Sequence, residues 1–594
     1  MKILSIKSRF YSYRYLFKYL KARRLQTSII ILFSSISAVS GGLSIGLIIP
    51  ILGGSTRPIF QDTPFDFLDN YLSFFSGDDF NSRIRSTAIL IIILSSIELI
   101  LNIICAIIAA RIELDVTKKL SIQVIDKIRN LEFKTFFGQT SGSYFTYLKT
   151  DVVAVGDVVS KFLVTLQPLV LLIIYLFVMA TVSPYLTIAS IFFFILISTL
   201  ITGILGRRLK STQKKLSELL VLLNSELNET FDNFKNLSSS GILNNQLERM
   251  QNKHADFLEA RYDYQKNISI GLPVNNFINS FAIAMLIILG AYIFRSQDDS
   301  WTILLIPFLV LLFKILPTIA QVNNMRNRVE SNYMYNDRLQ RFLNLRERST
   351  IDEIEQFNKL EDSIQFQNID FSYSEKNKTL ENISFTLKKN NLTALLGESG
   401  SGKSTIVDLL LKIYQPESGK IYFDDKNLST LRTESLRNNI SYVSQDALFF
   451  NRSVEENLKI FNEKLDNKYI MDSLTTLNLE SLKDDLDNIL GQGGINLSSG
   501  QKQKLNFIRS YLKPSQLLIL DEPTSNLDFE SEDVLKNYIT EIKSTQTILL
   551  ITHSKRLLEL ADEIIVLDNG KVVENGTADE ILNNNEYLSR MIES

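Results

Sequence analysis

The sequence has little cysteine and little histidine, and both shortages exclude kinds of site. A single cysteine among 594 residues leaves no partner for a disulfide within the chain, and two histidines are too few for a histidine-rich metal centre. The charges nearly cancel, with 63 Lys and Arg against 65 Asp and Glu, so no large positive face is available to hold a nucleic acid. We therefore expect no nucleic-acid partner, and a chemistry that depends on neither thiols nor clustered imidazoles.

Charge is also missing locally, from six long stretches of the N-terminal half. The first stretch, residues 27–52, contains no charged side chain, and as an α-helix it exceeds the ~30 Å hydrocarbon core of a bilayer. Six such lengths cannot all be interior to one soluble domain, so the sequence predicts six membrane-spanning helices. The other five stretches, in which Glu98 and Lys314 are the only charged residues, are 88–110, 162–182, 186–205, 269–294 and 301–321.

Basic residues predict the side of the membrane on which the chain begins. Residues 1–26 contain eight Lys and Arg and no acidic residue, with aromatic residues between them, which indicates a helix at the cytoplasmic lipid interface. The loops 111–161 and 206–268 then fall on the same side, hold eight and ten basic residues, and show helical periodicity. We expect an integral multi-pass protein of the cytoplasmic (inner) membrane whose helices continue into the cytoplasm.

A phosphate-binding motif follows soon after residue 348, where the composition changes to alternating strand and helix patterns. A buried-strand pattern at 392–396 runs into GESGSGKST and then into a helical pattern. Glycines let backbone N–H groups surround phosphates, Lys403 would neutralise the β- and γ-phosphates, and Ser404 would offer its hydroxyl to Mg²⁺. This P-loop predicts a site for ATP and Mg²⁺ made by Gly397, Ser399, Gly400, Gly402, Lys403, Ser404 and Thr405.

Two further strand ends supply groups that ATP hydrolysis needs. The apolar strand at 517–520 leads into Asp521 and Glu522, which suits a Mg²⁺-holding carboxylate beside one that polarises the attacking water. The strand at 547–552 delivers His553 to the carboxyl end of a core strand, where ligand sites of α/β folds form. Each feature alone would also suit an ordinary solvated strand end. The P-loop upstream favours catalytic roles for Glu522 and His553.

In their order these motifs resemble those of ATP-binding cassette (ABC) transporters, specifically the half-transporter exporters of the type IV fold. The segment 497–501 (LSSGQ) is similar to the family signature and 525–528 (SNLD) is similar to the D-loop, although Ser499 replaces a usual signature glycine. Six spans and one cassette then imply a homodimer, with a heterodimer as the alternative. The nucleotide-site residues that the resemblance adds are Tyr373 for adenine stacking, Gln445 for nucleotide and Mg²⁺, and Ser498, Gly500, Gln501 and Asp528.

The expected fold class is multi-domain, with an all-α transmembrane domain of six helices followed by an α/β P-loop ATPase domain. We expect an interfacial helix at 1–26, a transmembrane domain at 27–325, a linker at 326–350 and a nucleotide-binding domain at 351–594. Two segments of the long inside loops, residues 136–152 and residues 229–241, resemble the coupling helices of the family.

The cargo is less well specified. The first outside loop places Phe65, Leu68, Leu72 and Phe75 on one helical stripe, similar to the short amphipathic helix of lipid-linked oligosaccharide flippases, although an ordinary loop would also fit. Flipping of a lipid-linked oligosaccharide is therefore the leading expectation. A multidrug or lipid exporter is the alternative, and an ATP-gated channel or regulator is a further one. In each case the cargo would be an amphipathic or lipid-linked substrate.

Two ionisable residues deep in the predicted spans are candidates for substrate contact. A charge at the bilayer centre costs about 3 kcal/mol on insertion scales, so Glu98 and Lys314 should each face a partner, a water-filled cavity or cargo. Asn102 shares a helical face with Glu98, which supports an inward orientation. The two charges would either pair with each other or leave Lys314 to meet an anionic group of the substrate.

Overall fold

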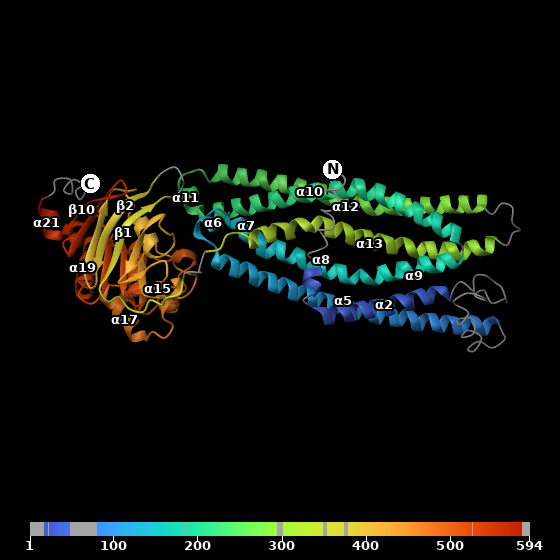
Figure 1. The fold of residues 1–594 in the computed structure, drawn as a ribbon, viewed down its shortest axis with the longest axis horizontal. Helices are drawn as coiled ribbons and strands as arrows, with labels where there is room; N and C mark the ends of the chain where they lie inside the picture. Colours follow the sequence, from blue (N-terminus) through green and yellow to red (C-terminus); the bar gives the residue numbers. More distant parts are fainter. Residues whose placement is uncertain are drawn as a thin grey trace. The chain divides into compact units, whose positions relative to one another are not determined.

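The computed structural model describes residues 17–21, 23–47, 80–182, 184–293, 301–348, 353–373, 378–525 and 527–584. The chain forms two compact units, Met1–Glu347 and Arg348–Ser594. The first unit is helical, and the second is built on β-sheets (Figure 1).

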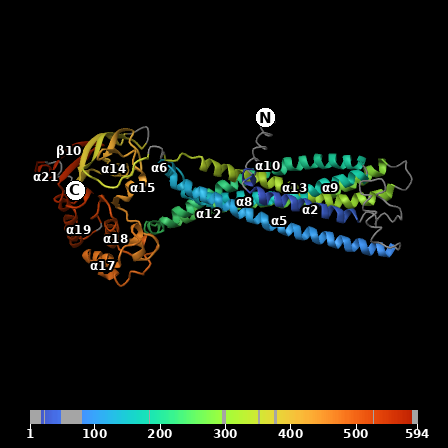
Figure 2. The same cartoon turned by 60° about the horizontal axis from the view of Figure 1, so that its bottom comes forward.

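Long helices packed side by side make up the first unit (Figures 1 and 2). Helix α2 packs along α5, and α10 packs along α12. Four stretches of the described residues are long and apolar enough to cross a membrane, namely Arg24–Ser44, Ile84–Asn130, Ser141–Ala180 and Phe308–Leu343. The elements are α2 (Arg24–Gly46), α5 (Phe80–Asn130), α6 (Phe133–Phe137), α7 (Ser141–Thr146), the π-helical turn η1 (Tyr147–Asp151), α8 (Val152–Val164), α9 (Leu166–Val182), α10 (Pro184–Asp232), α11 (Phe234–Ser239), α12 (Leu243–Ile293) and α13 (Trp301–Leu343).

The six apolar stretches fall, in order, on α2, α5, α9, α10, α12 and α13. The predicted linker at 326–350 differs from the structure, because α13 continues through it as far as Leu343. Val329, Leu339 and Phe342 are fully or almost fully buried, so this part of the helix still has an apolar face to pack. Residues 1–16 of the predicted interfacial helix and the aromatic stripe at 65–75 lie outside the described residues.

The segment 136–152, predicted as a coupling helix, forms the end of α6, then α7 and η1. Its last turn is fixed by a buried ion pair. Asp151 is fully buried and accepts hydrogen bonds from Arg338 of α13, one of them from Nε at 2.7 Å, and Arg338 also donates from Nη1 to Ser217 Oγ of α10 at 2.8 Å. Arg338 thereby joins η1, α10 and α13. The second predicted coupling segment, 229–241, covers the end of α10 and α11.

Two sheets organise the second unit. The larger has the strand order β10-β9-β3-β8-β7-β6, and its pairs β9-β3, β3-β8, β8-β7 and β7-β6 are parallel. The smaller is antiparallel, with the order β2-β1-β4-β5. The strands are β1 (Ser363–Phe371), β2 (Leu380–Lys388), β3 (Leu392–Gly397), β4 (Ser418–Phe423), β5 (Lys426–Asn427), β6 (Ile440–Val443), β7 (Leu517–Asp521), β8 (Thr547–Ile551), β9 (Glu563–Asp568) and β10 (Lys571–Thr577).

Helices complete this unit and cover a core in which β3 and β8 are buried along their whole length. Because β3, β6, β7 and β8 run parallel, their carboxyl ends meet at one edge of the sheet. That edge is where the sequence motifs lie. The helices are α14 (Lys403–Leu410), α15 (Thr433–Asn438), α16 (Val454–Leu458), α17 (Asn467–Thr476), α18 (Ser499–Tyr511), α19 (Phe529–Ile542), α20 (Lys555–Leu558) and α21 (Ala578–Asn584).

Candidate active site

The P-loop joins the end of β3 to the start of α14, and two of its glycines have a steric reason. At Gly397 an added Cβ would lie 2.5 Å from Leu567 O of the neighbouring strand β9. Gly402, which caps α14, has a φ of 108°, and a Cβ there would lie 2.5 Å from Leu380 Cδ2. Neither position tolerates a side chain, so the loop can turn tightly and direct its amides inward.

Lys403 begins α14 and turns back over the loop. Its Nζ donates to Gly397 O at 2.5 Å and to Glu398 O at 3.0 Å. Burial lowers the pKa of Lys403, and the carboxylates of Glu522 and Asp521 oppose that effect. A cation close to two carboxylates and loop carbonyls is placed to meet phosphate oxygens. The neighbouring loop residues that are exposed for the same purpose are Ser399, Gly400 and Ser404.

Tyr373 lies beside the P-loop helix. Its hydroxyl donates to Asp408 Oδ2 at 3.1 Å and lies 3.1 Å from the hydroxyl of Thr405, a P-loop residue that is buried. Its ring packs edge-to-face against Phe371 and Tyr414, with centroids 5.0 and 5.2 Å apart. These contacts hold an aromatic ring next to the loop with 43% of the residue exposed. Stacking on adenine stays a prediction.

Asp521 ends β7, and Tyr442 of β6 donates from its hydroxyl to Asp521 Oδ2 at 3.0 Å. Burial raises the pKa of Asp521, while this hydrogen bond and Lys403 act in the opposite direction. A carboxylate that is partly removed from water but oriented by a donor gains from a bound cation. Sequence reasoning missed Tyr442, because nothing in the strand pattern shows that its hydroxyl points to a residue 79 positions away.

Glu522 follows directly and adopts a left-handed backbone conformation, with φ of 47°. Its Oε1 is buried, has no hydrogen-bond partner among the described residues, and lies 3.6 Å from His553 Nε2. Burial, with the nearby Asp521, raises the pKa of Glu522, whereas burial and Lys403 lower the pKa of His553. The arrangement pairs a carboxylate that binds protons more readily than usual with an imidazole that stays neutral at pH 7, which suits proton abstraction from water.

The signature segment begins α18. Ser498 caps this helix, since its Oγ accepts from Gln501 N at 3.2 Å and Gln501 Oε1 accepts from Ser498 N at 2.9 Å. Gly500 lies in the first turn, so the positive end of the helix is unobstructed there. Asp528 caps α19 with a single main-chain hydrogen bond, accepting from Ser531 N at 3.0 Å, and hydrogen bonding by Ser531 lowers the pKa of Asp528.

Gln445, predicted to contact nucleotide and Mg²⁺, is exposed on the loop after β6. The residue before it, Ser444, accepts a hydrogen bond at its carbonyl from Asn506 Nδ2 of α18 at 3.2 Å. One turn earlier on the same helix, Gln503 Nε2 donates to Glu522 O at 2.8 Å. The sequence offered one signal for these two residues: they are polar and three positions apart on a helix with an apolar face.

Glu98 and Lys314, the candidate substrate residues, lie on α5 and α13 of the first unit. Glu98 Oε1 accepts from Gln167 Nε2 of α9 at 3.3 Å, and its carboxylate packs on Gly41 of α2, where an added Cβ would lie 2.8 Å from Oε2. One turn along α5, Asn102 Oδ1 accepts from a serine hydroxyl of α2 at 2.8 Å. Glu98 therefore has neighbours on two other helices, whereas Lys314 is exposed.

Comparisons with known proteins identify the family and the fold. The family description "ABC transporter transmembrane region" matches residues 29–316, and the description "ABC transporter" matches residues 380–525. The heterocyst differentiation ATP-binding protein HepA of Nostoc sp. is 24% identical over 93% of this chain and 91% of its own length. An ATP-dependent lipid A-core flippase of Neisseria meningitidis is 30% identical over 54% of this chain and 52% of its own length. A bacterial Atm1-family ABC exporter with ATP bound has the same fold, with a TM-score of 0.79 at 18% identity over 96% of this chain and 98% of that one.

Proposed function

Because the chain belongs to the ABC transporter family and has the architecture of an exporter half-transporter, we propose that two copies of it flip an amphipathic, lipid-linked substrate outward across the cytoplasmic membrane. The protein is a multi-pass membrane protein that binds and hydrolyses ATP to drive export. One observation carries the catalytic part of the proposal. The ends of three parallel strands present Lys403, Asp521, Glu522 and His553 at one edge of the sheet.

In the proposed hydrolysis, Glu522 accepts the proton of the attacking water, and His553 lies beside that carboxylate with its Nε2 3.6 Å from Oε1, where it can contact the terminal phosphate or the water. Lys403 counters the charge of the phosphates. Ser404, Gln445 and Asp521 would hold Mg²⁺, and a hydroxyl, an amide and a carboxylate give the hard oxygen donors that this ion prefers. When bound, Mg²⁺ neutralises charge on the terminal phosphates. Tyr373 would support the adenine at the other end of the nucleotide.

We propose a homodimer as the working form, with a heterodimer as the alternative. A chain with one membrane domain and one ATPase domain is half of a transporter, and the exporter relatives imply a second half. The free N-terminus of α18, capped by Ser498 and Gln501, offers amides and a positive dipole end to the phosphate of a nucleotide bound by the other copy. Native mass spectrometry of the protein purified in detergent tests this, since two identical chains are expected.

The charged residues of the first unit support an anionic substrate group. Glu98 has a hydrogen-bond donor in Gln167, and Lys314 is exposed while it lies within electrostatic reach of Glu98. Along α13, Gln321 and Asn324 are exposed seven and ten positions after Lys314, on the same side of the helix. This polar track is expected in a helix that lines a water-filled path, because lipid would exclude it. A phosphate or pyrophosphate next to a lipid chain would match Lys314.

The decisive experiment measures ATP turnover and transport by the purified protein. In nanodiscs, ATPase activity is followed against lipid-linked sugars, phospholipids and amphipathic drugs, and in liposomes the movement of the stimulating compound to the other leaflet is followed with ATP. Stimulation and movement of a lipid-linked sugar are expected. Stimulation by drugs or phospholipids alone would favour the multidrug or lipid exporter, and an ATP-dependent ion conductance without transport would favour a channel.

A further inference from the structure

Helix α18 places three buried polar side chains within about a third of its circumference. Gln503, Asn506 and Arg509 are only 5%, 1% and 7% exposed, and they follow each other at intervals of three residues. Side chains as polar as these need hydrogen-bond partners when buried. All three find them in main-chain groups at the catalytic edge of the sheet.

Gln503 holds the main chain of the catalytic carboxylate. Its Nε2 donates to Glu522 O at 2.8 Å and to Ser525 Oγ at 3.3 Å. On the other side, Glu522 N donates to Ile551 O at 2.9 Å. A left-handed backbone conformation is unfavourable for a residue with a Cβ, so Glu522 needs contacts that hold it there. The two hydrogen bonds to its main chain provide them and thereby fix the position of Cα, from which the Glu522 side chain extends.

Asn506 and Arg509 hold the segment that contains Gln445. Asn506 Nδ2 donates to Ser444 O at 3.2 Å, and its Oδ1 accepts from Arg509 Nη2 at 2.7 Å. Arg509 Nη1 donates in turn to Leu448 O at 2.6 Å. Their two acceptors bracket Gln445 at one residue before it and three residues after it. One side of α18 therefore fixes both the general base and the segment with a Mg²⁺ ligand.

Burying the charged side chain of Arg509 lowers the stability of the folded protein. Burial lowers its pKa to about 10, so it stays charged at pH 7. In the described part of the chain its guanidinium donates hydrogen bonds to the carbonyl of Leu448 and the side-chain amide of Asn506. It also lies 5.1 and 5.7 Å from the ring centroids of Phe449 and Phe461, and none of these partners is a carboxylate. Burying a cation without a counter-ion costs stability, which argues that the geometry it imposes is what matters.

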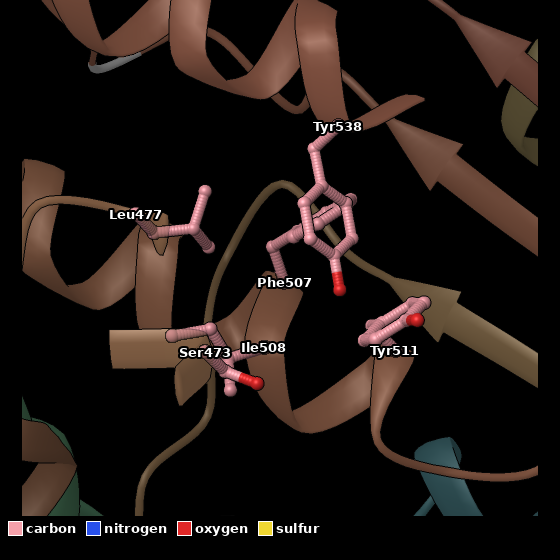
Figure 3. A pocket seen from close by; sticks show the side chains of 6 residues that line it. All are labelled: Ser473, Leu477, Phe507, Ile508, Tyr511 and Tyr538. Carbon is pink, nitrogen blue, oxygen red and sulfur yellow. The ribbon is translucent and has the colours of Figure 1, made fainter. Parts of the chain in front are cut away.

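An adjoining side of α18 is held by aromatic packing. Phe507 and Tyr511 meet the ring of Tyr538 on α19 edge-to-face, at centroid distances of 5.5 and 4.8 Å. Figure 3 shows these rings lining a small pocket together with Ser473 and Leu477 from the end of α17. Aromatic packing and buried hydrogen bonds on adjoining sides therefore hold α18 against both α19 and the catalytic edge of the sheet.

We propose that Gln503 and Asn506 are positioning residues for ATP hydrolysis. Both residues lie on α18, whose first turn carries the signature segment. Their hydrogen bonds fix the main chain of Glu522 and the segment around Gln445 to the same helix, so the proposed base and the proposed Mg²⁺ ligand are positioned together. The inference rests on the proposed ATPase function. It adds two residues that act through others and touch neither nucleotide nor water.

Gln503→Met tests the first contact, since methionine keeps the volume and removes the donor. The turnover number kcat should fall about tenfold, the effect of one hydrogen bond, with KM for ATP within about twofold. Gln546→Met is the matched control, because Gln546 Nε2 also donates to a backbone carbonyl and a serine hydroxyl, those of Ser515, at 3.2 and 2.8 Å. The control should keep wild-type kcat.

Asn506→Asp separates positioning from stability. The carboxylate keeps an acceptor for Arg509 and gains charge, but it cannot donate to Ser444 O. We expect kcat to fall by about tenfold while the unfolding temperature stays at or above that of the wild type. Asn439→Asp removes an amide donor to the carbonyls of Phe357 and Ser435 at the amino end of β6, the end away from the catalytic edge. It is the control and should keep wild-type kcat.

Three outcomes would overturn the proposal: kcat near the wild-type value in Asn506→Asp, a rise in KM instead of a fall in kcat, or a loss of activity that matches the loss of stability in both variants. If Gln503→Met fails to fold, Asn506→Asp decides alone. Failure of the proposed function gives a different result, namely a folded wild-type protein that binds ATP but does not hydrolyse it.

Discussion

Tyr442→Phe removes one hydroxyl and leaves its ring in place, and we expect it to weaken the response of the ATPase to Mg²⁺. The hydroxyl donates to Asp521 Oδ2 at 3.0 Å. A hydrogen bond to a charged group contributes about 1.5–3 kcal/mol, which corresponds to roughly ten- to hundredfold. Because Asp521 is only partly buried, the lower end applies, and the free Mg²⁺ that gives half-maximal turnover should rise about tenfold.

The dependence on pH gives a second, independent measurement. Burial already raises the pKa of Asp521, and the hydroxyl opposes this, so its removal raises the pKa further. Protons then compete with Mg²⁺ at a higher pH than in the wild type, and the defect of the variant should grow as the pH is lowered. Tyr422→Phe, on β4 of the smaller sheet, is the control. A wild-type Mg²⁺ response in Tyr442→Phe, or a defect that does not grow at low pH, would refute this role for Tyr442.

Three further outcomes are expected. Glu522→Gln should still bind ATP, measured with a fluorescent analogue, but its turnover should fall about a hundredfold or more, and normal turnover in this variant would contradict the assignment. Because burial raises the pKa of Glu522, wild-type turnover should also decline as the pH falls through that raised pKa. Tyr373→Ala should lower the affinity for ATP about tenfold through loss of ring stacking, and unchanged affinity would place the adenine elsewhere. Tyr373→Phe loses only the hydrogen bonds to Thr405 and Asp408, so its affinity for ATP should stay within about threefold of the wild-type value. Lys314→Ala should abolish stimulation of ATPase activity by substrate and keep basal turnover within about twofold, measured on folded dimer; full stimulation would rule out its contact with the substrate.

The parts of the site that sequence reasoning could identify are those in which a short stretch of chain carries the chemistry. The glycines of the P-loop are readable because backbone conformation and close approach demand them locally, as at Gly402. Ser498 and Gln501 were readable as a signature, and their spacing also encodes the reciprocal cap that begins α18. In the first unit, charge-free stretches sufficed to predict helices, since they are too long for anything else.

Contacts between distant residues could not be predicted in this way. Arg338 and Asp151 are 187 positions apart, and either one alone looks like an ordinary charged residue of a helix. Tyr442 reads only as an aromatic residue in a strand. The end of α13 was also missed, because the residues after 325 are polar enough to suggest a linker, and only packing in three dimensions shows that Val329 and Leu339 still bury an apolar face.

The lengths of the helices in the first unit have a mechanical consequence. Helices α5 and α12 have 51 residues each, or about 76 Å, more than twice the thickness of the hydrocarbon core. Helix α12 contains Pro273, whereas α5 has no internal proline and is the straighter rod. A rod of that length acts as a lever: a tilt of about 10° around its midpoint moves each end by about 6–7 Å, in opposite directions. A displacement at the scale of one helical turn at one end therefore requires only a small angular change in the membrane, where the neighbouring helices can keep their packing. A helix as long as α5 thus couples a small rotation at its centre to large movements at its ends.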